Sequence, residues 1–382
     1  MLWQLELLIW SMTHNSSVKD GGIYNLNPKD ILVIFITNQK DRPEKYQYEL
    51  SNYAKNIISY YGVRYIVDTN NYGVHSGIHR FSYRNSLEVI KYCPLNKPCS
   101  LAYIWEYLNR EYGDIDFDDY KFVVILEADL FAFGELNFDK FPKDKTSIAY
   151  HWLIRDWTIG KKQNEKEGTQ EGEKIHLNLF NDGTTLIDWM KAAGISKKNI
   201  DKFVPGACIM WIRTEDFTPE FIDRTILWTK FMLYASTLVT DKDLYISELP
   251  AYSLALAHCG VDVELIDEVE FHPGNMGYPN IPLGSLIHYT YGDQWPLRTE
   301  EAELNVDYFN KRCYGSIRGD GYRGDGRGKS IFDFPDELKR GLECESINGD
   351  RLNQAHAFFE YCLQISKNVP IDRTYKFNSG KA

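Results

Sequence analysis

The stretch YKFVVILEADLFAFGE, at residues 120–135, combines an apolar, β-branched run with two acidic residues that end it. Residues 122–126 have the pattern of a buried strand, and Glu127 and Asp129 follow directly. Ligands of open α/β sheets bind at the carboxyl ends of the strands. On an extended backbone, one intervening residue turns both acidic side chains to the same face, with Cα atoms about 6–7 Å apart. Such a pair is typical of a site for hydrated Mg²⁺ or Mn²⁺, which substrate phosphates complete.

The alternative for Glu127 and Asp129 is a solvated turn, since strands often end in acidic residues. Leu130, Phe131 and Phe133 favour the ligand site, because an exposed turn would be polar at these positions. The continued apolar sequence predicts that the two carboxylates lie on the floor of a pocket.

The composition of the whole chain indicates a folded globular protein with a large core. Its 382 residues are 43% hydrophobic and 14% aromatic, which allows two or three domains. The net charge of −11 argues against a nucleic-acid-binding protein, because nothing provides the basic face that neutralises phosphates. The 26 tyrosines and 9 tryptophans are typical of sites that stack on sugars or nucleobases, although large cores use them too.

The cysteines and the N-terminus contain neither a recognisable metal motif nor a membrane span. The 7 cysteines include no C-x-x-C pair and no zinc-ligand spacing. The first residues, MLWQLELLIWSM, are apolar over a short length, lack a basic region and contain Glu6. We therefore expect a truncated anchor or a peripheral strand or helix there, and no later segment that crosses a bilayer. As far as the sequence shows, the chain is soluble.

Strand and helix patterns alternate along the chain, which predicts an α/β fold. The helix that begins near Asn96 has Ser100 as a plausible cap. Its buried face would consist of Leu101, Ile104, Trp105 and Leu108. The predicted strands lie at residues 30–37, 63–67, 122–126, 147–152, 203–212, 263–269 and 285–290. The predicted helices lie at residues 46–60, 96–108, 185–198, 219–236, 244–258 and 351–367.

Changes in composition along the chain predict three parts. These are an N-terminal segment at 1–22, a central α/β domain at 23–312, and a Gly/Arg-rich linker with a peripheral C-terminal helix at 313–382. Within the central domain, residues 160–174 are rich in Lys, Glu, Gln and Gly. This insertion cannot bury enough apolar surface to offset the entropy of ordering, so we expect it to be dispensable for folding.

Further candidate site residues lie beside the predicted elements. Asp68 follows a strand and suits a ribose or uracil contact, or it belongs to a solvated turn. Gly206 and Ala207 would let a ligand approach the backbone closely, or they serve tight strand packing. Glu248 lies within an apolar helical face, where a carboxylate is costly unless it is paired or catalytic. His288 ends a short strand, as a third metal ligand or as an ordinary core or surface histidine.

Several of these motifs, in this order, resemble the hydroxyproline O-arabinosyltransferases and the related peptidyl serine O-galactosyltransferases, which are GT-A enzymes that use UDP-sugars. The resemblance spans roughly residues 31–312. Glu127-Ala128-Asp129 is similar to the E-P-D of the arabinosyltransferase branch, and to the D-A-D that follows a V-V-I-L strand in the serine galactosyltransferase branch. The motifs are Asn96-Lys97-Pro98, VVILEADLF (123–131), VPGACIM (204–210), SELPAYSLALAHCGV (247–261) and LIHYTYG (286–292), of which the last is the most specific.

The resemblance implies a GT-A fold, which is Rossmann-like with a mixed, mostly parallel sheet flanked by helices. It also implies a retaining, metal-dependent transfer from a UDP-sugar to a protein hydroxyl or a glycan, an N-terminal anchor, and a location in the Golgi or the ER lumen. The expected ligands of Mn²⁺ or Mg²⁺ are Glu127, Asp129 and His288, and Glu248 is the expected catalytic residue. Donor-binding candidates are Thr37, Asn38, Asp68, Lys97, Gly206, Ala207 and Gly292, and acceptor-binding candidates are His151, Trp152 and Tyr252.

Two other classes of protein could share this sequence pattern. A non-catalytic carbohydrate- or peptide-binding module on the same fold would be expected to lose Asp129 or His288, and both are present. An NAD-dependent oxidoreductase is disfavoured, because no G-x-G-x-x-G follows the first strand.

Overall fold

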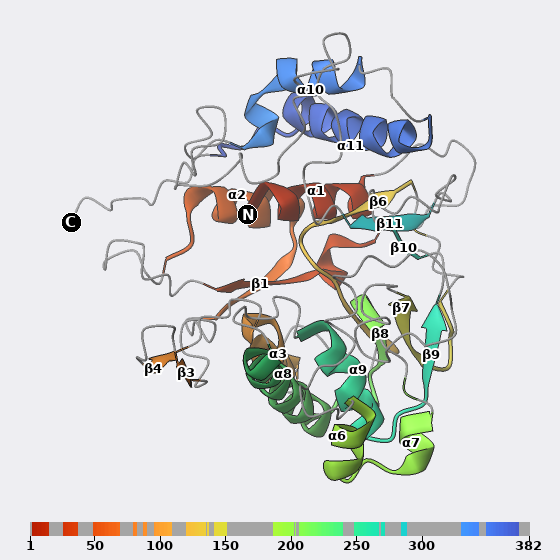
Figure 1. Cartoon of the computed structure of the whole chain (residues 1–382). Helices are drawn as coiled ribbons and strands as arrows, with labels where there is room; N and C mark the ends of the chain where they lie inside the picture. The colour runs from red at the N-terminus through yellow and green to blue at the C-terminus, as the bar shows by residue number, and fades with distance from the viewer. Residues whose placement is uncertain are drawn as a thin grey trace, which may run out of the picture. The chain divides into compact units, whose positions relative to one another are not determined.

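The computed structural model forms two compact units, each built from separate segments of the chain (Figure 1). The first unit comprises residues 1–67, 127–138 and 268–382, and the second comprises residues 68–126 and 139–267. The structure describes residues 2–14, 26–36, 49–68, 79–81, 87–89, 95–108, 120–134, 136, 141–150, 186–201, 203, 206–239, 248–266, 269–271, 284–288, 330–343 and 349–373. The insertion at 160–174 lies outside these ranges, so its dispensability stays a prediction.

The first unit contains helices and two small sheets. The helices are α1 (Leu2–Thr13), α2 (Asn52–Tyr61), α10 (Pro335–Leu342) and α11 (Gly349–Asn368), with the 3₁₀ turns η1 (Pro28–Asp30) and η9 (Ile331–Asp333). One sheet pairs β1 (Leu32–Ile36) with β2 (Arg64–Asp68). The other has the order β10 (Glu270–Phe271), β11 (Ser285–His288), β6 (Leu130–Phe133), in which β11 is parallel to β10 and antiparallel to β6.

The second unit contains a four-stranded sheet with helices. The sheet has the order β5 (Phe122–Ile125), β8 (Gly206–Arg213), β7 (Thr146–Tyr150), β9 (Val263–Ile266). The helices are α3 (Asn96–Leu108), α6 (Leu186–Ala192), α7 (Lys197–Asp201), α8 (Pro219–Val239) and α9 (Glu248–His258). A short antiparallel pair, β3 (His79–Phe81) and β4 (Leu87–Val89), completes the described elements of this unit.

Local signals in the sequence set the ends of several helices. Ser51 caps α2, because its side chain accepts a hydrogen bond from the Ala54 N–H, and Gly62 ends that helix in the left-handed region at φ 68°. Gly194, at φ 80°, interrupts the single helix predicted at 185–198, which forms α6 and α7 instead. Ser100 does not cap α3 as predicted, because the helix already begins at Asn96.

The α/β class is confirmed, but the sheets are mixed rather than mostly parallel. Among the described pairs with an assigned direction, β7 with β9 and β10 with β11 are parallel, and the other four are antiparallel. The predicted strand at 122–126 forms β5, at the edge of its sheet, with Val124 38% exposed. Its β-branched residues suit any pleated, half-buried surface, so their pattern alone did not predict the depth of burial.

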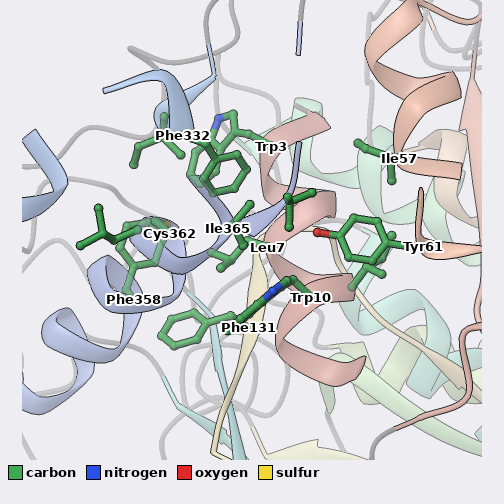
Figure 2. Packing of buried hydrophobic residues seen from close by; sticks show 14 of the residues in the cluster. Trp3, Leu7, Trp10, Ile57, Tyr61, Phe131, Phe332, Phe358, Cys362 and Ile365 are labelled. Atoms are coloured by element: carbon green, nitrogen blue, oxygen red, sulfur yellow. The ribbon is translucent and has the colours of Figure 1, made fainter. Parts of the chain in front are cut away.

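The N-terminal and C-terminal helices belong to the core of the first unit and are not peripheral as predicted. Trp3 and Leu7 of α1 pack with Phe131 of β6 and with Phe358 and Cys362 of α11, and all five are fully buried (Figure 2). These large side chains bury more apolar surface against each other than a peripheral position would allow. The domain boundaries at 22/23 and 312/313 stay a prediction. Among the described helices, none has both the length and the apolar character that crossing a bilayer requires.

Candidate metal centre

The pairing of β6 with β11 brings together three residues that are far apart in the sequence. Asp129 immediately precedes β6, and Glu127 lies two residues before Asp129. His288 is the last residue of β11. His288 lies opposite Leu130 in the antiparallel register, so the imidazole is beside the turn that carries both acids. Sequence reasoning named these three residues, and the structure places them together.

The three side chains converge within a few ångströms. His288 Nε2 lies 3.2 Å from Asp129 Oδ1 and 3.6 Å from Glu127 Oε2. One ligand atom from each residue can be chosen so that all lie within 4.8 Å of one another. The His288 side chain is 3% exposed, and those of Glu127 and Asp129 are 15% and 17% exposed. The acids therefore lie at the rim of the interior, which only partly matches the predicted pocket floor.

The arrangement could hold a metal ion. The donor atoms of Asp129 and Glu127 lie 3.2 and 3.6 Å from His288 Nε2, which is close enough for the three residues to hold one ion between them. The donor set combines carboxylates, which suit Mg²⁺ and Mn²⁺, with an imidazole, which suits first-row transition metals. Without metal, the same distances suit an imidazolium paired with carboxylates, and a metal titration separates these two states.

Glu248 has a cationic partner that the sequence did not identify. Lys97 Nζ lies 3.0 Å from Glu248 Oε1, with the Glu248 side chain 3% exposed and the Lys97 side chain 39% exposed. Glu248 is also the first residue of α9, where the helix dipole favours a negative charge. A carboxylate at this buried position is costly unless it is paired or catalytic, and the structure shows that Glu248 is paired. The catalytic role of Glu248 and the donor contact of Lys97 stay predictions.

Asp68 and Tyr252 are interior residues. Asp68 is fully buried and accepts a hydrogen bond of 3.0 Å from the Ser100 hydroxyl, which contradicts the solvated turn considered for it. A ribose contact would require this carboxylate to leave Ser100, so that role stays a prediction. Tyr252, on α9, is 1% exposed within the core of the second unit, and its contact with an acceptor stays a prediction. The burial of both side chains depends on tertiary packing, which a local pattern does not contain.

The remaining candidates are only partly described or lie outside the described residues. Gly206 and Ala207 open β8, and Gly206 lies opposite Tyr150 of β7, which places them in a sheet. The candidates outside the described ranges are Thr37, Asn38, His151, Trp152 and Gly292.

Comparisons with known proteins give no relative for this chain. No protein-family model, curated protein or solved structure matches it.

Proposed function

We propose that this chain is a divalent-metal-dependent glycosyltransferase that moves a sugar from a UDP-sugar to a protein hydroxyl, as the hydroxyproline O-arabinosyltransferases do. A peptidyl serine O-galactosyltransferase activity is the alternative with the same site. The observation that carries the proposal is the convergence of Glu127, Asp129 and His288 at the junction of β6 and β11. The GT-A fold and a Golgi or ER lumenal location belong to the same proposal.

Each of the three residues has a specific role in this proposal. Asp129 and Glu127 supply the negative charge that holds a dication, and His288 supplies a neutral nitrogen donor through Nε2. A bound Mn²⁺ or Mg²⁺ would act as a Lewis acid that stabilises the charge on the departing diphosphate. The partial exposure of both carboxylates supports the proposal, because a phosphate group must complete the coordination from outside the protein.

The central test compares ligand-induced thermal shifts of the parent with those of Asp129→Asn. The amide keeps the shape of the carboxylate and removes its charge. Mn²⁺ with UDP should raise the Tm of the parent by mass action, by the equivalent of about 2.7 kcal/mol when the ligand is at 100 times its Kd. Asp129→Asn should lose this shift, and its transfer rate should fall by orders of magnitude. The matched control is Asp223→Asn, an exposed aspartate on α8, which should behave as the parent does.

A screen of UDP-sugar hydrolysis with Mn²⁺, with and without EDTA, identifies the donor. Hydrolysis of one UDP-sugar that EDTA abolishes would support the proposal, and peptides with hydroxyproline or serine would then identify the acceptor. Full turnover in metal-free buffer, or an unchanged thermal shift in Asp129→Asn with transfer intact, would overturn it. Metal-dependent UDP binding without any hydrolysis or transfer would indicate a binding module instead.

A further inference from the structure

Side chains from both terminal helices cover the outer edge of β6. In the described sheet, β6 pairs with β11 on one side only. Successive backbone N–H groups of a strand point to opposite edges, so those of Ala132 and Gly134, which are two residues apart, point the same way. The Ala132 N–H donates to Ser11 Oγ of α1 at 3.0 Å, and the Gly134 N–H donates to Tyr361 Oη of α11 at 3.2 Å. Such capping by side chains is one way in which proteins cover an exposed strand edge.

Ser11 connects α1 and β6 rigidly. Its side chain is 1% exposed, and its hydroxyl donates to the Leu8 carbonyl of its own helix at 2.9 Å while it accepts from Ala132. The hydroxyl hydrogen and a lone pair are thus used in opposite directions, which fixes the side-chain orientation. A buried hydroxyl held in this way transmits any displacement of the helix to the strand.

Tyr361 supports the same strand from α11. Its ring lies edge-on to Phe131 of β6, with centroids 6.1 Å apart, and against Trp10 of α1, with centroids 5.2 Å apart. Figure 1 shows the arrangement of these elements, with α1 beside β6 and α11 next to α1. The position of β6 is therefore set by two helices as well as by its pairing with β11.

The capped strand leads directly to the metal centre. Asp129 precedes β6 by one residue, and Leu130 pairs with His288. The distance from Ala132 to Asp129 is three residues, or about 10 Å along a strand. Metal–ligand distances lie within about 0.2 Å of their usual values, so a small displacement of Asp129 relative to His288 would weaken the binding of a metal ion by the two residues.

We propose that Ser11 and Tyr361 are positioning residues for the metal centre, and this inference rests on the proposed function above. Neither residue contacts the metal. Both hold β6 in the position at which Asp129 and His288 bind one ion. The N-terminal helix is, in this proposal, part of the apparatus that forms the metal site.

The test measures the Kd of Mn²⁺ alone, by the loss of the free-ion signal in electron paramagnetic resonance, well below the Tm of each variant. Loss of a group that orients metal ligands typically weakens metal affinity 10- to 100-fold. We expect the Kd to rise about tenfold in Ser11→Ala, since the effect passes through a strand, and also to rise in Tyr361→Phe. Ser11→Thr keeps the hydroxyl and should restore most of the affinity. The matched control is Thr13→Ala, because the Thr13 hydroxyl donates to the Ile9 carbonyl of its own helix at 2.7 Å.

A spectroscopic measurement separates positioning from a general loss of stability. The visible absorption of bound Co²⁺ reports its coordination geometry, and at saturating Co²⁺ it should change in Ser11→Ala and not in Thr13→Ala. An unchanged Mn²⁺ Kd and Co²⁺ spectrum in both Ser11→Ala and Tyr361→Phe would overturn the positioning role and leave the proposed function intact. Absence of Mn²⁺ binding by the parent would overturn both. Mn²⁺ binding with the expected losses but without UDP-sugar turnover would support positioning and count against the transferase.

Discussion

Gly341 lets α10 pack closely against α11, because glycine has no side chain. A Cβ at this position would lie 2.6–2.8 Å from three ring carbons of Phe359, which is itself 1% exposed and packs edge-on to Phe358. Gly341→Ala gains about 1 kcal/mol of helix propensity, but overpacking costs about 1–3 kcal/mol. The contacted atoms belong to a buried ring, so we expect net destabilisation, measured by urea and thermal unfolding.

The double variant Gly341→Ala with Phe359→Leu provides the control for this prediction. The smaller side chain gives space to the added methyl group, so the combined loss should be less than the sum of the single losses. A Gly341→Ala protein that is as stable as the parent would show that α10 can shift away from α11 at no cost.

At the scale of single residues, the sequence predicts which side chains could bind a ligand better than it predicts how each side chain is buried. Glu127, Asp129 and His288 each come at or directly after a short apolar strand, and this local feature was sufficient to name them together. Asp68 also follows a strand, yet it is buried against Ser100. No local pattern distinguishes these two situations, because the distinction depends on which helix packs over the strand end.

At the scale of elements, the contact of α8 with α9 should make stability depend on pH. The indole N–H of Trp228 donates to Nδ1 of His258 at 3.3 Å, which requires that nitrogen to be unprotonated. Burial, together with the nearby Arg224, lowers the pKa of His258 below its usual 6.5. The unfolded state therefore takes up the proton first as the pH falls, and the free energy of unfolding should decrease as the pH falls below about 6.5 and through the lowered pKa.

The measurement is the free energy of unfolding between about pH 8 and pH 5 for the parent and for His258→Gln. The glutamine keeps a hydrogen-bond acceptor and cannot take up a proton in this range, so its acid-induced loss should be smaller. Burial also lowers the pKa of His14, so some loss of stability should remain in the variant. Identical pH profiles for the two proteins would exclude His258 as a source of the dependence.

Elements were predicted more reliably than their pairing. The strands β1, β2, β5, β7, β8, β9 and β11 and the helices α3, α8, α9 and α11 all fall on predicted segments. Strand direction was not predictable in the same way, because alternation and β-branching look alike in parallel and antiparallel pairs. The split of 185–198 into α6 and α7 depends on Gly194, whose left-handed conformation is visible only in the structure.

At the scale of the molecule, a buried ion pair connects the two ends of the first unit. Arg373, beyond α11, donates to Glu6 of α1 from Nη2 to Oε1 at 2.7 Å and from Nε to Oε2 at 3.0 Å. Tyr53 of α2 adds a hydrogen bond of 2.5 Å to the same carboxylate, which is fully buried. Arg373→Met should cost about 3–5 kcal/mol, because it leaves a buried carboxylate without its cation.

The double variant Glu6→Met with Arg373→Met tests the cause of this loss by urea unfolding. Removal of both charges also removes the cost of burying them, so the double variant should be more stable than Arg373→Met alone. A loss in Arg373→Met of less than about 1 kcal/mol would indicate that the pair behaves as an exposed salt bridge. The sequence did not predict this pair, because Glu6 and Arg373 are far apart in the chain. Glu6 is a single acidic residue in an otherwise apolar segment, and nothing near it in the sequence indicates its partner.

The packing of α1 against α11 also determines when the first unit can fold during synthesis. Translation proceeds at about 5–20 residues per second, so α1 leaves the ribosome on the order of 15–70 s before α11 is made. Throughout that time Trp3, Leu7 and Glu6 lack the partners that α11 and Arg373 provide in the finished protein. The second unit, which needs no residue beyond 267, can fold while the chain is still growing. The contacts of α1 with α11 and Arg373 can form only after translation has passed Arg373, and until then part of the apolar surface of this N-terminal helix stays uncovered.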